Sequence, residues 1–329
     1  MQTIDFPEII GERFNSPEFI AEIKDIADSD GIVLITGETG TGKDVLAKMI
    51  VKLSKRKNKP FISVNCASIP ESLLETTLFG HKKGAFTSAI DNQKGYLEEA
   101  NGGTIFLDEI AETSLNFQAA LLKVLEDGFI RRVGENKEIH IDVRFLFATN
   151  KNLKEEIRNN RFRKDLFYRI DVFDIKLEPL RERPEDIEKL AYYFLSIFAE
   201  KNQKQILYIA PETLKILKKQ HWDGNVRQLK NVMERAVVKT KSDTIIPSDL
   251  PKIYLSNTAI SSTDKKTDFI NLSNEALNHS YEDIKESFDK QYFLLMLDKT
   301  NGNISEIAKI SDLNRKTLYN KFKKLGIKI

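Results

Sequence analysis

Glycines and a lysine with the spacing of a phosphate-binding loop stand near the start of the sequence. They fit the pattern G-x-x-x-x-G-K and read Gly37, Glu38, Thr39, Gly40, Thr41, Gly42 and Lys43. The segment follows an apolar β-branched run (32–36) and precedes an amphipathic helical pattern (44–53). Glycines let several backbone N–H groups converge on phosphate oxygens, and Lys43 adds a full charge at the β- and γ-phosphates. The pattern therefore predicts a nucleoside triphosphate site, with ATP as the expected ligand.

Two adjacent acids, Asp108 and Glu109, follow a later apolar run (104–107). Asp108 would hold Mg²⁺, and Glu109 would orient and deprotonate an attacking water as a general base. Adjacent carboxylates repel each other unless a cation lies between them and the phosphates. After the loop lysine, where this motif usually has Ser or Thr, stands Asp44. Its carboxylate could bind Mg²⁺ as a hard oxygen donor, or it could simply suit a helix N-terminus.

The elements that would position these residues alternate along the first half of the chain. Short β-branched or aromatic runs are separated by helix-length segments, and they cover 32–36, 61–64, 104–107, 143–149 and 172–175. This alternation predicts an α/β fold with a parallel, doubly wound sheet and helices on both faces. From about residue 179 to residue 250 only helical patterns remain, which indicates a separate small helical domain.

The overall composition limits the classes of protein that remain open. The chain has 329 residues with 41% hydrophobic and 30% charged residues, enough for several domains with real cores. A net charge of +2 gives no overall attraction to nucleic acid, so such binding would need a local patch. A lone cysteine, Cys66, and four scattered histidines predict neither an internal disulfide nor a His/Cys metal site. Without a signal peptide or an apolar stretch of membrane-spanning length, a cytoplasmic protein with no membrane partner is expected.

The motifs together resemble those of the sigma-54-dependent transcriptional activators, the bacterial enhancer-binding proteins of the AAA+ class. The segments that carry the resemblance lie at 37–44, 61–89, 102–110, 121–134, 147–150, 162–173, 179–187 and 222–238. The resemblance implies an AAA+ core with a helical lid, working as a homo-oligomer that ranges from a dimer to a hexameric ring. An acidic residue at the position of Asp44 is usual in this family.

The resemblance also assigns roles around the nucleotide. Asn65 would sense Glu109 and link nucleotide state to movement, although an asparagine here could also be a turn residue. Thr149 and Asn150 would form the first sensor, which reads the γ-phosphate. Arg227, in the segment GNVR, would be the second sensor, on the lid.

Two arginines, Arg163 and Arg169, are implied as fingers that reach the nucleotide of a neighbouring subunit. A finger arginine neutralises the charge that builds on the transferred phosphoryl group. On one helix, residues six apart point in different directions, so the two cannot occupy one equivalent position. One would therefore contact the γ-phosphate while the other holds the subunit interface. The alternative for either is a surface salt bridge with Asp165 or Asp171.

The family's signature loop, G-A-F-T-G-A, is present with one change. It reads Gly84, Ala85, Phe86, Thr87, Ser88 and Ala89, so a serine stands at the second glycine. Small residues flank a single aromatic ring, which could anchor a contact with a partner. The implied partner is sigma-54 RNA polymerase, and the alternative is that Phe86 packs on its own domain. If the replaced glycine needs a positive φ, Ser88 would be strained there and could reorient the loop.

The C-terminal end predicts a DNA-binding helix-turn-helix that resembles the Fis type, with helices at 303–310 and 314–325. Leu318, Phe322 and Leu325 would face its core. From residue 301 onward there are seven basic residues and two acidic ones, and this local positive charge suits binding to the phosphates of DNA. Ser311 and Asp312 depart from the usual turn residues. Upstream DNA would be contacted by Asn314, Arg315, Lys316, Thr317, Tyr319, Asn320 and Lys323, and the stripe 288–295 would pair subunits.

Four segments follow from this organisation. They are a nucleotide-binding subdomain (1–178), a helical lid (179–250), a flexible linker (251–274) and the all-α DNA-binding domain (275–329). No room remains before the phosphate loop for a regulatory domain, so control by a regulatory protein in trans or through expression level is expected. Two alternatives stay open beside the sigma-54 activator. One is a DNA-binding AAA+ regulator that no longer engages sigma-54, and the other is an ATPase with another remodelling task.

Overall fold

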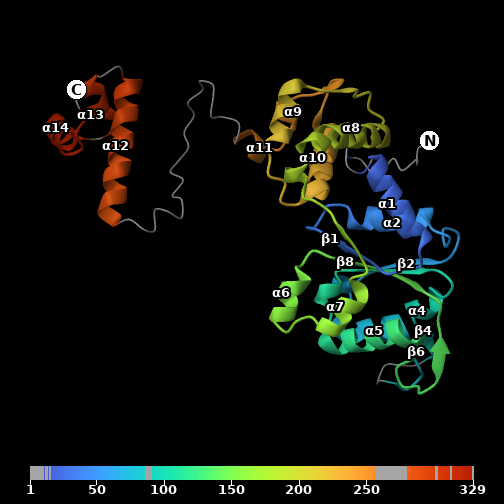
Figure 1. Ribbon diagram of the computed structural model, residues 1–329. Helices are drawn as coiled ribbons and strands as arrows, with labels where there is room; N and C mark the ends of the chain where they lie inside the picture. The colour runs from blue at the N-terminus through green and yellow to red at the C-terminus, as the bar shows by residue number, and fades with distance from the viewer. Residues whose placement is uncertain are drawn as a thin grey trace. The chain divides into compact units, whose positions relative to one another are not determined.

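The computed structural model describes residues 11, 14, 16–85, 91–256, 280–300, 303–311 and 313–327. The chain divides into two compact units, 1–261 and 262–329. Among the helices of these described residues, none has the length and apolar character that crossing a membrane requires. Figure 1 shows the sheet, the lid and the C-terminal helices with their labels.

The first unit contains a five-stranded parallel sheet in the order β2-β5-β8-β1-β9. Its strands are β1 (Val33–Thr36), β2 (Phe61–Asn65), β5 (Thr104–Asp108), β8 (Arg144–Thr149) and β9 (Phe173–Lys176). All five predicted runs are therefore strands of one sheet, and the doubly wound prediction is confirmed. The direction of strand order reverses at β1, and ligands of such sheets bind beyond the carboxyl ends at this point.

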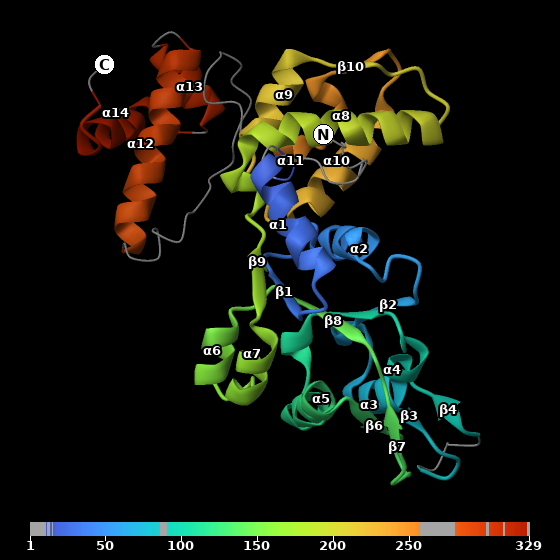
Figure 2. The same cartoon turned by 45° about the vertical axis from the view of Figure 1, so that its right-hand side comes forward.

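Helices cover both faces of the sheet because successive side chains of each strand point to opposite faces (Figures 1 and 2). Leu34, Ile105 and Leu107 pack in the core under α3, α5 and α7. Phe106 and Leu146, which alternate with such residues, pack in the core under α1 and α2. The bounds are α1 (Pro17–Asp28), α2 (Lys43–Leu53), α3 (Glu71–Phe79), α4 (Tyr96–Glu99), α5 (Leu115–Asp127), α6 (Leu153–Arg158) and α7 (Lys164–Ile170).

Two short antiparallel hairpins extend from this subdomain, and the sequence patterns did not predict either. One pairs β3 (Gly80–His81) with β4 (Gln93–Lys94), and the other pairs β6 (Phe129–Arg131) with β7 (Glu138–His140). His81 forms an isolated bridge to Val133, which joins the two hairpins. Short 3₁₀ turns complete the subdomain: η2 (Cys66–Ser68) and η3 (Ile110–Glu112).

The lid is helical, as predicted, but it also contains one two-residue parallel pair, β10 (Tyr208–Ile209) with β11 (Thr244–Ile245). Its core is built around the buried Trp222. The lid elements are η4 (Leu180–Glu182), α8 (Pro184–Lys201), α9 (Pro211–Lys218), α10 (Asn225–Lys239), η5 (Pro247–Asp249) and α11 (Lys252–Ser256). The segment predicted as a linker from 251 therefore begins with a helix, whereas 257–274 lies outside the described residues.

The second unit contains α12 (Tyr281–Lys299), α13 (Ile304–Ile310) and α14 (Arg315–Lys324). Asn303 and Asn314 cap the last two helices, because their side-chain oxygens accept hydrogen bonds from first-turn amides. Leu318, Phe322 and Leu325 are buried together with Phe293, so the predicted core face is confirmed.

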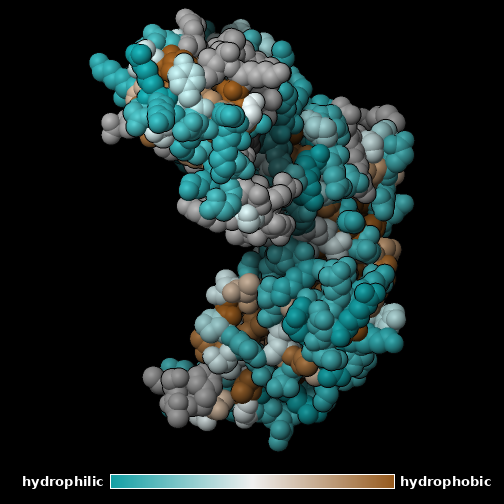
Figure 3. All heavy atoms as spheres, turned by 90° about the vertical axis from the view of Figure 1, so that its left-hand side faces the viewer, coloured by the Kyte–Doolittle hydropathy of each residue, from teal (hydrophilic) through white to brown (hydrophobic). Residues whose placement is uncertain are grey.

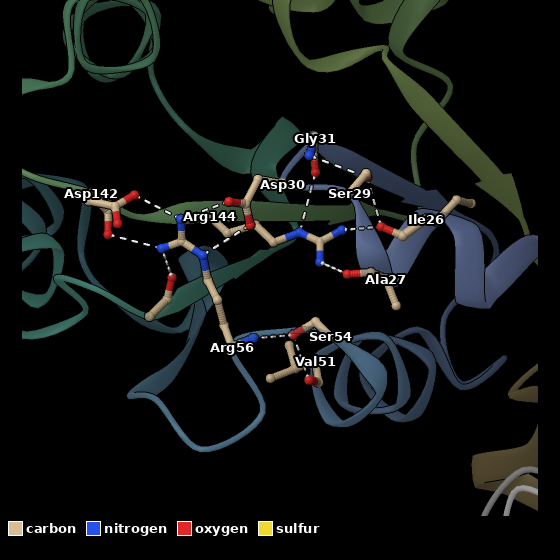
Figure 4. Close-up of polar contacts among 11 residues, drawn as sticks. Ile26, Ala27, Ser29, Asp30, Gly31, Val51, Ser54, Arg56, Asp142 and Arg144 are labelled. Carbon is tan, nitrogen blue, oxygen red and sulfur yellow. Dashed lines mark hydrogen bonds and ion pairs between the residues drawn. The ribbon is translucent and has the colours of Figure 1, made fainter.

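A buried arginine fastens α1 to the sheet at the amino ends of the strands. Arg144 begins β8 and donates to the carbonyl oxygens of Ile26 at 2.5 Å and Ala27 at 2.9 Å, at the end of α1 (Figure 4). These carbonyls carry the negative end of the helix dipole. The guanidinium therefore satisfies them with hydrogen bonds and offsets their partial negative charge. Next to it, Arg56 bridges Asp30 and Asp142. Arg144 and Arg56 thus anchor the chain at the amino ends of the strands, on the opposite side of the sheet from the carboxyl ends.

Among the described residues on the face drawn in Figure 3, hydrophobic areas are separate from one another and surrounded by hydrophilic residues. Exposed apolar side chains in the described residues include Tyr168 of α7, Val172 between α7 and β9, and Leu207 just before β10. Scattered apolar residues of this kind are ordinary on protein surfaces.

Candidate functional site

The phosphate loop connects the carboxyl end of β1 to the start of α2. Gly40 and Gly42 adopt φ values of 81° and 106°, which side chains rarely tolerate. A Cβ on Gly42 would meet no atom within 4 Å, so the space beside the loop is open there. This open side and the first amides of α2 are what an anion site of the predicted kind requires.

Lys43 lies inside the loop with its side chain only 6% exposed. Its Nζ donates to the carbonyl oxygens of Gly37 at 3.0 Å and Glu38 at 3.3 Å. The same nitrogen is 3.7 Å from Oε1 of Glu109. The lysine is thus fixed between the loop and the acidic pair, where it could bind phosphate oxygens.

The acidic pair lies at the carboxyl end of β5, beside the loop. The amide of Glu109 donates to Oδ1 of Asp108 at 3.0 Å, and Glu109 itself adopts a left-handed φ of 56°. Burial raises the pKa of Asp108, the charge of Glu109 raises it further, and Lys43 opposes the rise. Two crowded carboxylates that favour a nearby cation fit Mg²⁺, whose preferred ligands are hard oxygens. Asp44 is exposed in the first turn of α2.

Polar residues from neighbouring strand ends complete this edge. Nδ2 of Asn65 donates to Asp108 at 3.4 Å, so its contact here is with Asp108 rather than the predicted Glu109. Oδ1 of Asn65 also accepts from the Ser68 amide, which matches the alternative role as a turn residue. Asn150 donates from its backbone to Glu109 at 3.1 Å and from its side chain to Oγ1 of Thr39 at 2.9 Å.

Two further sensor residues lie at the margins of the loop. Thr149 is buried, and its carbonyl accepts from the Gly37 amide at 3.2 Å while its Oγ1 accepts from the Lys151 amide. The Arg227 amide donates to the Gly40 carbonyl at 3.3 Å. Both positions are therefore next to the loop, although their assigned roles remain predictions.

The lid contacts the loop through residues to which the sequence analysis gave no role. Arg181 of η4 forms a two-point ion pair with Glu38, at 2.6 and 2.8 Å. Asn225 donates to Oε2 of Glu38 and to the Thr39 carbonyl, both at 3.1 Å. These partners hold the pKa of Glu38 at about 2, well below its ordinary value of 4.5. Arg181 and Asn225 do lie in segments that carry the family resemblance, 179–187 and 222–238, and this was the only indication in the sequence that they belong to the site.

We expect this ion pair to give Glu38→Gln a pH-dependent loss of stability. Because the folded state lowers the pKa of Glu38, the carboxylate stabilises the fold above about pH 4.5, and this contribution disappears as pH falls towards about 2. The Glu38 side chain is 41% exposed, so solvent screening keeps the contribution modest. Denaturant unfolding of the parent and variant between about pH 7 and about pH 3 should show the gap in stability closing.

Glu75→Gln is a suitable control because Glu75 is exposed in the middle of α3 and far along the chain from the loop. It should alter stability little at any of these pH values. A gap between the parent and Glu38→Gln that stays constant with pH would contradict the assignment of the stability to the ion pair.

The two candidate fingers lie at either end of α7. Arg163 is the N-cap residue rather than a helical one, and its guanidinium forms a two-point ion pair with Asp165, as one alternative anticipated. Arg169 donates to the Leu125 carbonyl at 2.6 Å. Gln118 accepts from the Arg163 amide and so fixes the chain there, a contact that the sequence did not reveal. A role towards another subunit remains a prediction for both arginines.

The signature loop leaves the first hairpin after β3. Gly84 has a φ of 81°, and the Ala85 amide donates to the Lys82 carbonyl. Lys82 also pairs with Glu135, next to the second hairpin, at 2.9 Å. Both hairpins therefore hold the base of the loop. Phe86, Thr87, Ser88 and Ala89 lie outside the described residues.

The predicted DNA-contacting residues lie on one side of α14 and at its start. Asn314, Arg315, Lys316, Tyr319, Asn320 and Lys323 are exposed, and Thr317 is half-buried. Arg315 donates to Oγ of Ser305, and Lys321 pairs with Asp289 of α12. Phe288 of the predicted pairing stripe is 42% exposed and Leu295 is 58% exposed. Asp312, in the turn, lies outside the described residues.

The sheet order, the loop followed by paired acids, and the helical lid define the AAA+ class of ATPases. Three family models agree: the sigma-54 interaction domain at 9–176, the AAA+ ATPase lid domain at 181–267 and the Fis-family bacterial regulatory protein at 286–325. The chain belongs to the family of sigma-54-dependent transcriptional activators, with a Fis-type helix-turn-helix for DNA binding.

Several curated relatives and solved structures resemble the chain. It is 40% identical to transcriptional regulatory protein ZraR of Salmonella typhimurium and 41% identical to regulatory protein AtoC of Escherichia coli. The alignments cover 94% and 95% of this chain and 67% of each relative. The crystal structure of NtrX from Brucella abortus in complex with ATP has 31% identity, a TM-score of 0.71, and coverage of 97% of this chain and 70% of that one.

Proposed function

We propose that the chain hydrolyses ATP with Mg²⁺ and uses the energy to remodel sigma-54 RNA polymerase at promoters. The observation that carries the proposal is the meeting of Lys43, Asp108 and Glu109 at one edge of the sheet, within 3.7 Å between Lys43 and Glu109. The NtrX structure with bound ATP supports the choice of nucleotide. The proposal keeps the four predicted segments, with boundaries at residues 178, 250 and 274, for nucleotide binding, lid, linker and DNA binding. It also includes a cytoplasmic location.

In this proposal each residue acts on one part of the nucleotide. The loop amides and Lys43 bind the β- and γ-phosphate oxygens, and Asn150 reads the γ-phosphate while it holds Glu109 through its amide. Glu109 orients the water and accepts its proton at a carboxylate oxygen, so the hydroxide equivalent attacks phosphorus as ADP leaves. Mg²⁺, held by Asp108, would offset the negative charge of the phosphates.

Catalysis also needs a cation from outside the subunit, which we assign to Arg163 or Arg169 of a neighbouring copy. In the single subunit Arg163 pairs with Asp165, and Arg169 donates to the Leu125 carbonyl. Assembly as a homo-oligomer, from dimers to a hexameric ring, brings one subunit's α7 to another's phosphates. The Fis-type helices would bind upstream DNA and raise the local concentration of subunits.

The contact with sigma-54 is assigned to the loop 84–89, and Phe86→Ala tests it. We expect ATP turnover to stay within about twofold of the parent, because the loop leaves the hairpins rather than the phosphate site. Promoter opening should be lost, since an aromatic anchor at the centre of a contact carries much of its energy. The measurement is ATP-dependent open-complex formation with purified sigma-54 RNA polymerase, alongside phosphate release.

Lys83→Ala provides a control because Lys83 is exposed two residues before Ala85. Its loss should leave promoter opening largely unchanged. Normal promoter opening by the Phe86→Ala variant would show that the loop does not act on sigma-54 as proposed.

A DNA-binding regulator that no longer engages sigma-54 is the second candidate, and Ser88 in place of glycine favours it. The two candidates differ in one assay. ATP-dependent open complexes on a sigma-54-type promoter are required by the first and excluded by the second.

A further inference from the structure

A tight turn of the lid, Trp222–Asn225, packs directly on the phosphate loop. Besides the Asn225 contacts with Glu38 and Thr39, the amide of Arg227 just after the turn donates to the Gly40 carbonyl. A Cβ on Gly40 would lie 2.4 Å from the Gly224 carbonyl oxygen, so the two backbones touch. The conformation of the loop therefore depends on the position of this turn.

The turn is held in a conformation that its residues do not favour by themselves. Trp222 and Asn225 have φ values of 57° and 49°, and a left-handed tryptophan is an outlier. The Asn225 amide donates to the Trp222 carbonyl at 2.7 Å, and the indole N–H donates to the Leu217 carbonyl at 2.9 Å. Strained backbone persists only when its surroundings fix it, and it commonly occurs at functional sites.

The side of the turn away from the loop contacts α11. Oε1 of Gln228 accepts from the Gly224 amide at 2.9 Å, and its Nε2 donates to the Tyr254 hydroxyl at 2.7 Å. The Tyr254 ring stacks on Trp222 with centroids 5.6 Å apart and planes 30° apart. The turn is thus contacted by the phosphate loop and by the last described helix of the first unit.

We propose that Asn225, Gln228 and Tyr254 are positioning residues for the phosphate loop. Through them, docking of α11 on the lid raises the affinity of the phosphate loop for nucleotide. The inference rests on the proposed ATP site. Coupling of this kind is reciprocal, so bound nucleotide strengthens the docking of α11 by the same factor. The chain continues from α11 towards the C-terminal helices, and events that release α11 would therefore weaken nucleotide binding.

The chain provides its own probe, because Trp222 is its only tryptophan and is 1% exposed. Tyr254→Phe removes the hydroxyl that Gln228 contacts and keeps the stacked ring. In the full-length chain we expect it to weaken binding of a fluorescent ATP analogue and raise KM for ATP about fivefold, with a much smaller change in kcat. Tyr254→Ala should weaken binding further and shift Trp222 emission to longer wavelength, because one face of the indole loses its cover.

A double-mutant cycle tests the path through Gln228. Both Gln228→Leu and Tyr254→Phe remove the Gln228–Tyr254 hydrogen bond, and Gln228→Leu also removes the bond from the Gly224 amide. The double variant should therefore bind ATP with nearly the affinity of Gln228→Leu alone. ATP should also change the Trp222 emission of the parent, and Tyr254→Ala should reduce that change by about half or more. Additive effects in the cycle would contradict the path.

Tyr208→Ala is a matched control, since Tyr208 is 57% exposed on the same lid in β10. It should leave ATP affinity and Trp222 emission as in the parent. If both Tyr254 variants remain folded by circular dichroism and bind the analogue with the affinity of the parent, the inference is wrong. A parent chain that binds no nucleotide would instead refute the proposed function, so the two failures are distinguishable.

Discussion

Replacing Glu109 by glutamine is expected to lower kcat for ATP hydrolysis by about 10²–10⁴-fold, the usual contribution of a general base. Glutamine is isosteric and can still accept the Asn150 amide that now bonds Oε2, but it cannot take a proton from water. ATP binding should persist, because the loop and Lys43 are unchanged. The removed charge is also the second cause of the raised Asp108 pKa, so Asp108 should ionise more readily in the variant.

The measurement compares single-turnover phosphate release with equilibrium binding of a fluorescent ATP analogue. Glu112→Gln is the matched control, because Glu112 lies three residues later and pairs only with the surface Lys151 among the described residues. It should hydrolyse ATP at nearly the rate of the parent. Hydrolysis by Glu109→Gln within a few-fold of the parent would show that another group accepts the proton.

Removing the finger arginine is expected to lower kcat for ATP hydrolysis by about 10³–10⁵-fold. Part of the lost activity should return when the variant subunits are mixed with subunits that keep the arginine. Arg169→Ala subunits keep an intact phosphate site, and Glu109→Gln subunits keep an intact arginine. In an equal, random mixture about a quarter of the interfaces join the two intact halves, so activity should return towards that fraction of the parent. Neither variant alone should recover at any concentration.

The same mixing experiment with Arg163→Ala decides between the two candidates. Freeing Arg163 requires breaking its two-point ion pair with Asp165, whereas Arg169 gives up a single hydrogen bond to a carbonyl. We therefore expect the larger repair with Arg169. Arg158→Ala, at the exposed end of α6, is the control and should need no repair. If no mixture regains activity, the arginines do not act between subunits.

The buried sheet and the loop could be predicted from the sequence because their signals are local. The run 145–148 is apolar and half aromatic through the middle of a strand, and the loop has its glycines within seven residues. The hairpins β3–β4 and β6–β7 and the pair β10–β11 could not be predicted. They are only two or three residues long and contain polar residues such as Gln93 and Glu138, so no alternation can develop.

The lid contacts of the site needed the tertiary structure. Glu38 and Arg181 are 143 residues apart in the chain, and neither has a local pattern that indicates the other. The left-handed Trp222 could not be inferred either, because residue type argues against that conformation. The segment 251–274 as a whole is rich in polar residues, which predicted a linker, yet it begins with the apolar run 253–255. Within that run Tyr254 packs on Trp222, so the start of the segment belongs to the lid.

Arg144 ties α1 to β8 at the amino ends of the strands, opposite the phosphate loop, and Arg56 joins two loops beside it. This end of the molecule can serve as a fixed reference for distance measurements. A spin label near Asp142 and another on the lid would report lid displacement during turnover, because only the second label should travel.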